Sequence, residues 1–503
     1  MEPERHRAHS GCTQSPLSPR RSRPTLRSPR TLREATLGVL GGCLLLLAAC
    51  SREPARTAAS AESWFAVKIN DGKAGWAKDI RSSGRTETAS EITIKRGDSP
   101  TRLFEETVWE EADGRPLRYT YRSQLSASES VQTGEIKGER LEVCVRAGAV
   151  EEKKVHAWAP HYLFPSRIEL LHREKGRAPG TAYTYMAWNP QFGKAVTHSV
   201  KVAAHDRRET SIDAMPGVVT TEWLDAEGRV VRSHTELMGM KIVHERCDRA
   251  AALMTDKGDV PEVLVRSLLR PSRKLADPRK VRKATYRLTI KEGEVREQAL
   301  RHDGQTVDKV EGRSITLTVD PVAAEDPKLT WPIDDGRYAA FLSETTILQC
   351  RDAKVIAAAK EAVGAETDAW KAARQIETWV RQKISKKSFG VGFASAREVL
   401  DALEGDCTEH SVLSAAMARA LGIPSRVAVG LVSVGDIFGG HMWTEVWVGK
   451  WVPLDATLPG EFDATHIKMG DSAAGGANLQ EDLLNVLFFI GKMELEILEA
   501  VER

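Results

Sequence analysis

The chain has 503 residues, of which 41% are hydrophobic and 28% are charged. This length exceeds what one compact core usually holds, so we expect a multidomain protein, and the composition excludes fibrous and disordered classes. The 72 Lys and Arg nearly balance the 70 Asp and Glu, and the net charge of +2 gives no basis for a nucleic-acid partner.

Residues 1–49 have the pattern of an export signal. An Arg-rich lead precedes an apolar run from Leu37 to Ala49, which is too short for an unstrained membrane span and typical of a signal-peptide core. The run ends in "LAAC", which resembles the lipobox of bacterial lipoproteins. That resemblance implies an exported protein, anchored to the membrane by acyl chains on Cys50. A signal cleaved elsewhere, with Cys50 incidental, is the alternative.

Ser51 follows Cys50, which resembles the sorting pattern of outer-membrane lipoproteins. We therefore expect the protein at the outer membrane, facing the periplasm. Residues 50–62 comprise the lipidated cysteine and a small, polar tether.

Residues 63–248 predict an antiparallel β-rich domain. Short alternating stretches such as "SEITIKRG", "LRYTYRS" and "TAYTYMAW" are separated by Gly, Asp and Asn turns. Two similar segments, "VWEEADGRPLRYTYRSQL" and "EWLDAEGRVVRSHTEL", each predict a hairpin. A sheet of this kind serves as a binding platform about as readily as a scaffold.

Residues 249–345 predict a linker and a small β-rich module, and residues 346–503 predict an α+β domain. "DAKVIAAAKEAVG" and "DAWKAARQIETWVRQKI" have the apolar spacing of helices. "SAREVLDALEG" opens with the capping-box spacing of Ser395 and Glu398, and we expect its helix to end at Gly405. A closing amphipathic helix is expected near the end of the chain.

The stretch "GDCTEH" places Cys407 at a predicted helix start. Asp406 and Glu409 have the spacing of a capping box, so the helix should begin at Cys407 and stop at Gly422. A thiol in the first turn feels the positive end of the helix dipole, which favours the thiolate, and unpaired N–H groups there are left for an oxyanion. The Asp406 carboxylate opposes the thiolate, so a base is still needed.

His441 and Asp455 are the candidate partners of Cys407. "HMWTEVWVGKWVPLDAT" alternates as a hairpin around Val448-Gly449-Lys450. With an odd-numbered loop, Trp447 pairs with Trp451 and the two candidates become diagonal neighbours on one face, within reach of an imidazole and a carboxylate. With a two-residue loop they would face opposite sides unless a bulge intervenes.

Together, "GDCTEHSVLSAAMARALGIPSRVAVG", "HMWTEVWV" and "WVPLDAT" closely resemble the transglutaminase-like superfamily. The resemblance covers about residues 352–460 and implies a papain-like fold. It also implies that Cys407 is the nucleophile, that His441 is the general base and then acid, and that Asp455 holds the imidazole in its productive tautomer.

Other interpretations of these residues stay open. Cys407 alone could be a small core residue, and with His410 it could form half of a metal site, although no second pair is spaced to complete a closed zinc site. Three tryptophans could wall a cleft or belong to the core: Trp443, Trp447 and Trp451. We expect no cofactor and no metal.

The sequence therefore predicts an enzyme that acts on amide bonds of peptides or proteins through a thioester, by hydrolysis or by transfer to an amine. The alternative is an inactive transglutaminase-like scaffold whose β-rich region binds a partner in the cell envelope. Metal-dependent hydrolysis is a third possibility. Cys144, Cys247 and Cys350 could supply at most one disulfide in addition.

Overall fold

The structure is a computed structural model, and it describes residues 61–502 apart from 97–98, 126–127, 238–239, 255–267, 292–296, 324–328, 388–393 and 474–492. The predicted lead, the lipobox with Cys50 and most of the tether lie outside the described residues. No described helix is both long enough and apolar enough to cross a membrane.

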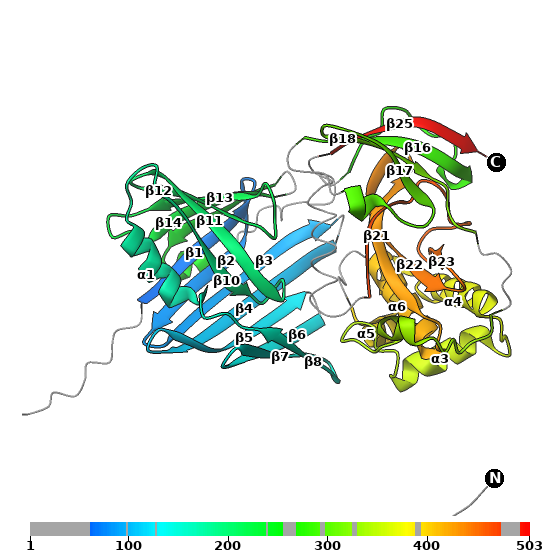
Figure 1. The fold of residues 1–503 in the computed structure, drawn as a ribbon, viewed down its shortest axis with the longest axis horizontal. Coiled ribbons are helices and arrows are strands. Elements are labelled where there is room, and N and C mark those ends of the chain that lie inside the picture. The colour runs from blue at the N-terminus through cyan, green and yellow to red at the C-terminus, as the bar shows by residue number, and fades with distance from the viewer. Residues whose placement is uncertain are drawn as a thin grey trace, which may run out of the picture. The chain divides into compact units, whose positions relative to one another are not determined.

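A sheet of fifteen strands occupies residues 61–247 (Figure 1). Neighbours follow the chain from β8 back to β1, then from β15 back to β9, and they are antiparallel except for β9 and β10. The predicted β-rich N-terminal region is confirmed. The strands are β1 (Ala61–Ile69), β2 (Gly72–Ser82), β3 (Arg85–Arg96), β4 (Ser99–Ala112), β5 (Arg115–Leu125), β6 (Ser128–Lys137), β7 (Arg140–Ala147), β8 (Val150–Ala157), β9 (Tyr162–Leu163), β10 (Ala182–Asn189), β11 (Lys194–Ala204), β12 (Arg207–Ile212), β13 (Val219–Leu224), β14 (Val230–Leu237) and β15 (Met240–Cys247).

Both predicted hairpins are present in this large sheet. β4 pairs with β5, and β13 pairs with β14. The first turn contains Asp113 and Gly114, with φ angles of 52° and 71°. Two successive residues with positive φ give a tight turn whose twist matches that of the strands, and Asp-Gly is a favoured pair for it.

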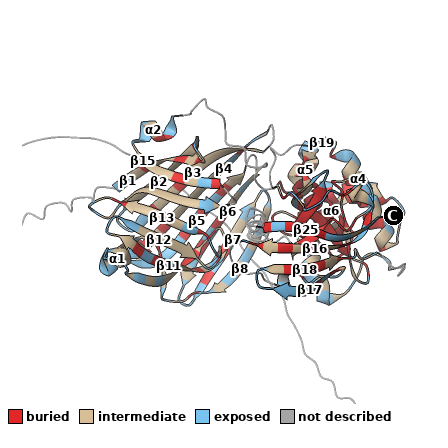
Figure 2. Cartoon of the chain, turned by 90° about the horizontal axis from the view of Figure 1, so that it is seen from above, coloured by how far each residue is buried: buried red, intermediate tan, exposed pale blue. Residues whose placement is uncertain are grey.

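The large sheet curls so that aromatic side chains of distant strands meet. The ring centroid of Trp188 on β10 lies 6.3 Å from that of Tyr119 on β5 and 5.0 Å from that of His156 on β8. Helix α1 (Pro165–Lys175) follows Phe164, whose ring packs edge-on against Trp109 at 4.6 Å. Burial alternates along strands such as β5 and β8, so one face packs inward and the other is exposed (Figure 2).

A four-stranded sheet, in the order β17-β18-β16-β25, joins the middle of the chain to its end. Its strands are β16 (Val281–Ile290), β17 (Gln305–Glu311), β18 (Ser314–Val319) and β25 (Met493–Glu502). The prediction of a closing helix is wrong for residues 493–502, which form the strand β25. Met493, Leu495 and Ile497 are buried at a spacing of two, and the strand pairs with β16. The predicted boundary between residues 345 and 346 therefore falls between β18 and β25, which belong to the same sheet.

In its described residues, the C-terminal region also holds four helices and a second four-stranded sheet, in the order β23-β22-β21-β24. Residues 408–419 of α6 are all buried, because the helix packs against both the sheet and the other helices (Figure 2). The elements are α3 (Ala353–Val363), α4 (Ala369–Lys383), α5 (Ala396–Ala402), α6 (Cys407–Ala420), β21 (Ser425–Val434), β22 (Ile437–Trp447), β23 (Trp451–Leu454) and β24 (Ile467–Ser472).

The capping box predicted for α5 is present. Ser395 accepts from the backbone of Glu398, and the Glu398 side chain accepts from the backbone of Ser395. The helix ends at Ala402, earlier than the predicted Gly405, because Leu403 takes a left-handed conformation with a φ of 50°. Short elements complete the chain: α2 (Arg249–Leu253), β19 (Lys386–Lys387), β20 (Glu404–Gly405) and the 3-10 helices η2 (Pro278–Lys280), η3 (Glu297–Leu300) and η4 (Gly336–Phe341).

Candidate active site

Cys407 is the first residue of α6, where the sequence placed it. Asp406 is the N-cap, and the Glu409 carboxylate accepts the N–H of Asp406 at 2.9 Å. The thiol therefore lies at the positive end of the helix dipole, which favours the thiolate. Cys407 is partly exposed, unlike the buried residues that follow it in the helix.

The expectation of unpaired N–H groups for an oxyanion is wrong for the residues after Cys407. The Asp406 carboxylate accepts the N–H of Thr408 at 2.9 Å and also bonds to the N–H of Glu409. The N–H of His410 donates to the Asp406 carbonyl at 3.2 Å. Capping satisfies the donors that could otherwise hold an anion, so these three groups are not an oxyanion site.

Glu409 changes the charge beside the thiol. It is fully buried, and its second carboxylate oxygen accepts the N–H of Ala394 at 3.2 Å. Burial, together with the Asp406 carboxylate, raises the pKa of Glu409 to about 8. At neutral pH Glu409 is therefore largely protonated and adds little negative charge that would oppose a thiolate at Cys407.

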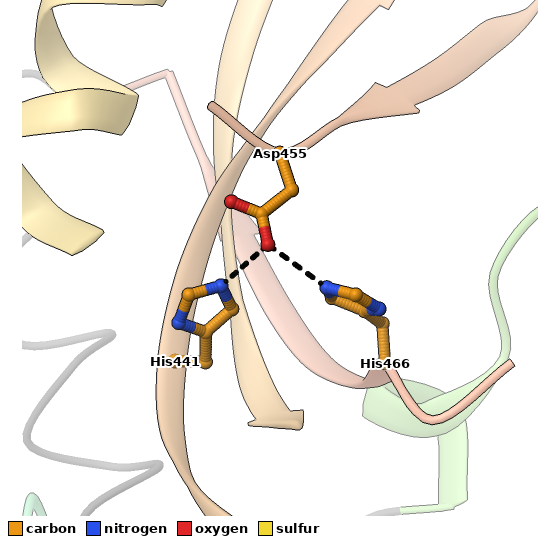
Figure 3. A group of neighbouring side chains, drawn as sticks. All are labelled: His441, Asp455 and His466. Carbon is orange, nitrogen blue, oxygen red and sulfur yellow. Dashed lines mark hydrogen bonds and ion pairs between the residues drawn. The ribbon is translucent and has the colours of Figure 1, made fainter. Parts of the chain in front are cut away.

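His441 on β22 and Asp455, just after β23, are in direct contact. Trp447 pairs with Trp451, which is the register that the odd-numbered loop predicted. His441 Nε2 lies 2.9 Å from Asp455 Oδ2, and the residues are 6% and 4% exposed (Figure 3). Because Nε2 bonds to Asp455, the other ring nitrogen, Nδ1, which points away from Asp455, is left to exchange a proton.

The turn after β23 holds the Asp455 carboxylate in place. Oδ1 accepts the N–H of Thr457 at 2.8 Å and that of Leu458 at 3.3 Å, an Asx-type arrangement. Burial alone would raise the pKa of Asp455, but His441 and a second histidine outweigh it and hold the pKa well below its usual range. Asp455 is therefore an anion that can orient His441 and stabilise its imidazolium.

Helix α6, which begins at Cys407, lies against the strand that carries His441. The helix packs against β22, and Thr444 Oγ1 on β22 donates to the Ser411 carbonyl on α6 at 3.0 Å. His441 and Asp455 are hydrogen-bonded to each other, and Cys407 begins the helix that packs against the strand of His441.

The family comparison agrees with this arrangement. Residues 356–456, which include Cys407, His441 and Asp455, match the model of the transglutaminase-like superfamily. These residues form a transglutaminase-like domain. The family resemblance inferred from the sequence is thereby confirmed for this part of the chain, whereas no curated protein matches the chain.

Solved structures give weak likenesses. A candidate cysteine protease from Cytophaga hutchinsonii has 17% identity and a TM-score of 0.29, over 38% of this chain and 79% of that one. A β-barrel-like protein from Brucella abortus, with a domain of unknown function, has 11% identity and a TM-score of 0.29, over 37% and 95%. A candidate protease from Parabacteroides distasonis has 13% identity and a TM-score of 0.18, over 66% and 64%. At TM-scores this low, the likenesses support no conclusion about this chain.

Sequence analysis missed a second histidine beside the transglutaminase-like motif. His466 Nε2 lies 3.1 Å from Asp455 Oδ2, the same oxygen that His441 contacts (Figure 3). A signal was present, because "DAT" occurs at 455–457 and again at 463–465, directly before His466. In both copies the Asp side chain accepts the N–H of the Thr at 2.8 Å, so the same local turn presents two carboxylates to one histidine.

His410 and Trp443 belong to the core of the domain. His410 is fully buried, and its Nδ1 lies 2.6 Å from the Asp406 carbonyl within the same helix start. Trp443 is 1% exposed, and its ring centroid lies 6.3 Å from that of His441 and 5.4 Å from that of His466. The Trp443 ring therefore packs against both histidines and excludes water from that side of them.

Trp447 and Trp451 are partly exposed and belong to an aromatic cluster. Their ring centroids lie 5.8 Å apart. Tyr338 stacks on Trp447 at 4.4 Å, and Phe341 meets Trp451 edge-on at 4.9 Å. These contacts account for both tryptophans as packing residues.

Among the described residues, one group has the composition of a metal site: His441, Asp455 and His466 place one potential ligand atom each within 4.8 Å of one another. Both histidine nitrogens bond to a single carboxylate oxygen. A metal ion would have to replace both hydrogen bonds, so the arrangement fits a hydrogen-bonded network better than a metal centre.

The cysteines that the sequence left unassigned are free thiols: Cys144, Cys247 and Cys350. Burial raises the pKa of Cys350, so this thiol is disfavoured as a thiolate. Among the cysteines that the structure describes, Cys407 is the one that begins a helix within the transglutaminase-like domain.

Proposed function

We propose that this chain is a thiol-dependent enzyme that attacks amide carbonyl groups of peptides or proteins. The observation that carries the proposal is the buried 2.9 Å bond between His441 and Asp455, in a transglutaminase-like domain whose central helix begins at Cys407. In this proposal Cys407 is the nucleophile, His441 is the general base and then acid, and Asp455 orients the imidazole.

The chemistry follows from the free nitrogen of His441. Nδ1 takes the thiol proton as Cys407 Sγ forms a bond to the carbonyl carbon. The carbon–nitrogen bond of the tetrahedral intermediate then breaks, Nδ1 returns the proton to the leaving amine, and a thioester remains. Water attacks the thioester with Nδ1 again taking a proton, which releases a carboxylic acid and restores the thiol.

An amine can replace water in the second half of the reaction, which would give transamidation. We propose hydrolysis, because water is always available. Incubation with dimethylcasein and a fluorescent primary amine separates the two reactions: incorporated label demonstrates transamidation, whereas fragments or released ammonia without label demonstrate hydrolysis. The Cys407→Ala variant is the control, because both reactions require the thiol.

The first test needs no substrate. Iodoacetamide alkylation of Cys407 is followed from pH 5 to 9 in the full chain and in His441→Ala, by peptide mass spectrometry. We expect rapid labelling below pH 7 in the parent chain and slower labelling in the variant, with Cys350 as the internal control of an ordinary buried thiol. Labelling of Cys407 that is no faster than a free thiol and indifferent to His441 would contradict the proposal.

Export and anchoring form a separate part of the proposal. The "LAAC" sequence after an apolar run supports lipidation of Cys50 and a position at the outer membrane, facing the periplasm. Cys50→Ser should release the protein from the membrane fraction, while Cys144→Ser should leave it there. A Cys50→Ser protein that stays in the membrane fraction would show that another anchor holds it.

A further inference from the structure

His466 lies with both ring nitrogens against hydrogen-bond acceptors. Nε2 is 3.1 Å from Asp455 Oδ2. Nδ1 is 3.1 Å from the Asp463 carbonyl oxygen and 3.5 Å from the Asp463 carboxylate. A neutral imidazole has one N–H and one bare nitrogen, so it would turn the bare nitrogen toward one of these acceptors. The protonated form donates at both positions and satisfies the geometry.

The charges around His466 support the protonated form. Asp455 and Asp463 are both buried carboxylates, and Arg279 of η2 holds the second of them at 2.7 Å. Burial alone would lower the pKa of His466, but hydrogen bonds to Asp455 and Asp463 raise it. Other titratable groups on neighbouring elements are His441 on β22 and Tyr286 on β16, whose hydroxyl donates to the Ala464 carbonyl. On α4, Arg381 donates to the Asp455 carbonyl at 2.6 Å and pairs with Glu377 at 2.9 Å.

Packing fixes the position of the ring. Phe462 stacks on His466 with 4.0 Å between ring centroids, and Trp443 meets it edge-on at 5.4 Å. His466 is 2% exposed. Its ring can therefore neither rotate away from Asp455 nor exchange that partner for water.

We propose that His466 is a positioning residue of the site: as an imidazolium between Asp455 and Asp463, it fixes the Asp455 carboxylate and offsets its charge. Its effect on His441 follows from Coulomb's law. Asp455 stabilises a protonated His441, and a second positive ring at 5.7 Å between centroids destabilises it. His466 thereby offsets part of the Asp455 charge that acts on His441.

This inference rests on the proposed roles of Cys407 and His441, but its test does not depend on a reactive thiol. The full chain carrying Cys407→Ala is labelled with ¹⁵N-histidine, and the ring nitrogens of His441 and His466 are titrated by NMR. The same titration is made with His466→Gln added, since Gln keeps an N–H donor and loses the charge. His244→Gln on β15 is the matched control, because its ring contacts the Ser233 hydroxyl instead of a carboxylate.

We expect both nitrogens of His466 to be protonated at pH 7.5, and the pKa of His441 to rise by about two units in His466→Gln. This is the size that a unit charge about 6 Å away exerts at an effective dielectric constant of about 20. His244→Gln should leave the His441 titration unchanged. A bare nitrogen on His466 at pH 7.5, or an unmoved His441 in a folded His466→Gln protein, would overturn the inference.

If His466→Gln does not fold, the protonation state of His466 in the Cys407→Ala chain decides the question alone. Failure of the proposed function has a different signature, namely ordinary alkylation of Cys407 in the parent chain. The two results are therefore independent of each other.

Discussion

The large sheet and the C-terminal region each contain a glutamate that forms ion pairs with two basic side chains, and the two clusters differ in burial. Glu151 on β8 lies 2.6 Å from Arg146 and 2.9 Å from Lys153, and the two basic side chains are 68% and 76% exposed. Glu445 on β22 lies 2.6 Å from Arg426 and 2.7 Å from Lys468, whose side chains are 14% and 6% exposed. The sheet keeps this cluster in water, and the C-terminal region buries its counterpart.

We interpret this difference in burial as the difference between a structural scaffold and a functional site. Exposed ion pairs are screened by water and contribute little to stability. Buried ones carry a desolvation cost, so they stabilise a fold poorly but hold their partners in fixed positions. Glu445 lies on β22, the strand that carries His441, and its partners Arg426 and Lys468 lie on β21 and β24 of the same sheet. We interpret these buried charges as groups that fix the geometry of the site.

Loss of the Asp455 charge should have the strongest effect on activity. Asp455→Asn removes the charge that orients His441 and leaves its tautomer undefined, so turnover should fall about 10⁴-fold. The measurement compares kcat/KM of the variant with that of the parent chain, on an amide substrate that the parent chain cleaves. Asp225→Asn in the large sheet, where the carboxylate bonds to exposed Arg229, is the control. Retention of more than a tenth of the activity in Asp455→Asn would remove this residue from the mechanism.

Next in size is the stability difference between the two glutamates. Glu445→Gln leaves Lys468 and Arg426 buried with less compensation, and it should lower the free energy of unfolding by about 3 kcal/mol. Glu151→Gln should leave the urea midpoint unchanged within error. Equal shifts in the two variants would mean that burial does not distinguish the regions.

The pH dependence of stability should also differ between a buried and an exposed glutamate. Folding raises the pKa of Glu409 from 4.5 to about 8 through burial and the Asp406 charge. Between these values the folded chain holds a proton that the unfolded chain releases, so stability falls as the pH rises. Urea midpoints at pH 5 and pH 8 should differ less in Glu409→Gln than in the parent chain. Glu151→Gln should keep the parent's difference, and an unchanged difference in Glu409→Gln would contradict the buried-acid interpretation.

The smallest expected effect concerns a helix cap. Ser395→Ala removes the oxygen that caps α5 and should cost about 1 kcal/mol of unfolding free energy in urea titration. Asp248→Ala, at the N-cap of the five-residue helix α2, should cost less, because few backbone groups depend on it. A larger loss at Asp248 would show that α2 matters more to the fold than its length indicates.

Local patterns predicted the parts of the fold that depend on neighbours in sequence. The alternation of "LRYTYRS" gave β5, the Asp-Gly turn gave the β4–β5 hairpin, and the spacing of Asp406 and Glu409 gave the start of α6. The same kind of reasoning failed for residues 493–502. They form β25 because a free edge of β16, more than two hundred residues earlier, offers the backbone hydrogen bonds of a fourth strand.

The candidate site divides in the same way. Local spacing was enough to place Cys407 at a helix start, but it left two loop lengths open for the hairpin of His441 and Asp455. The folded chain was needed to show that the loop is odd-numbered, that Asp406 occupies the helix N–H groups and that His466 shares the Asp455 oxygen. Which acceptors a buried side chain meets is set by packing between elements, and the order of residues along the chain does not specify it.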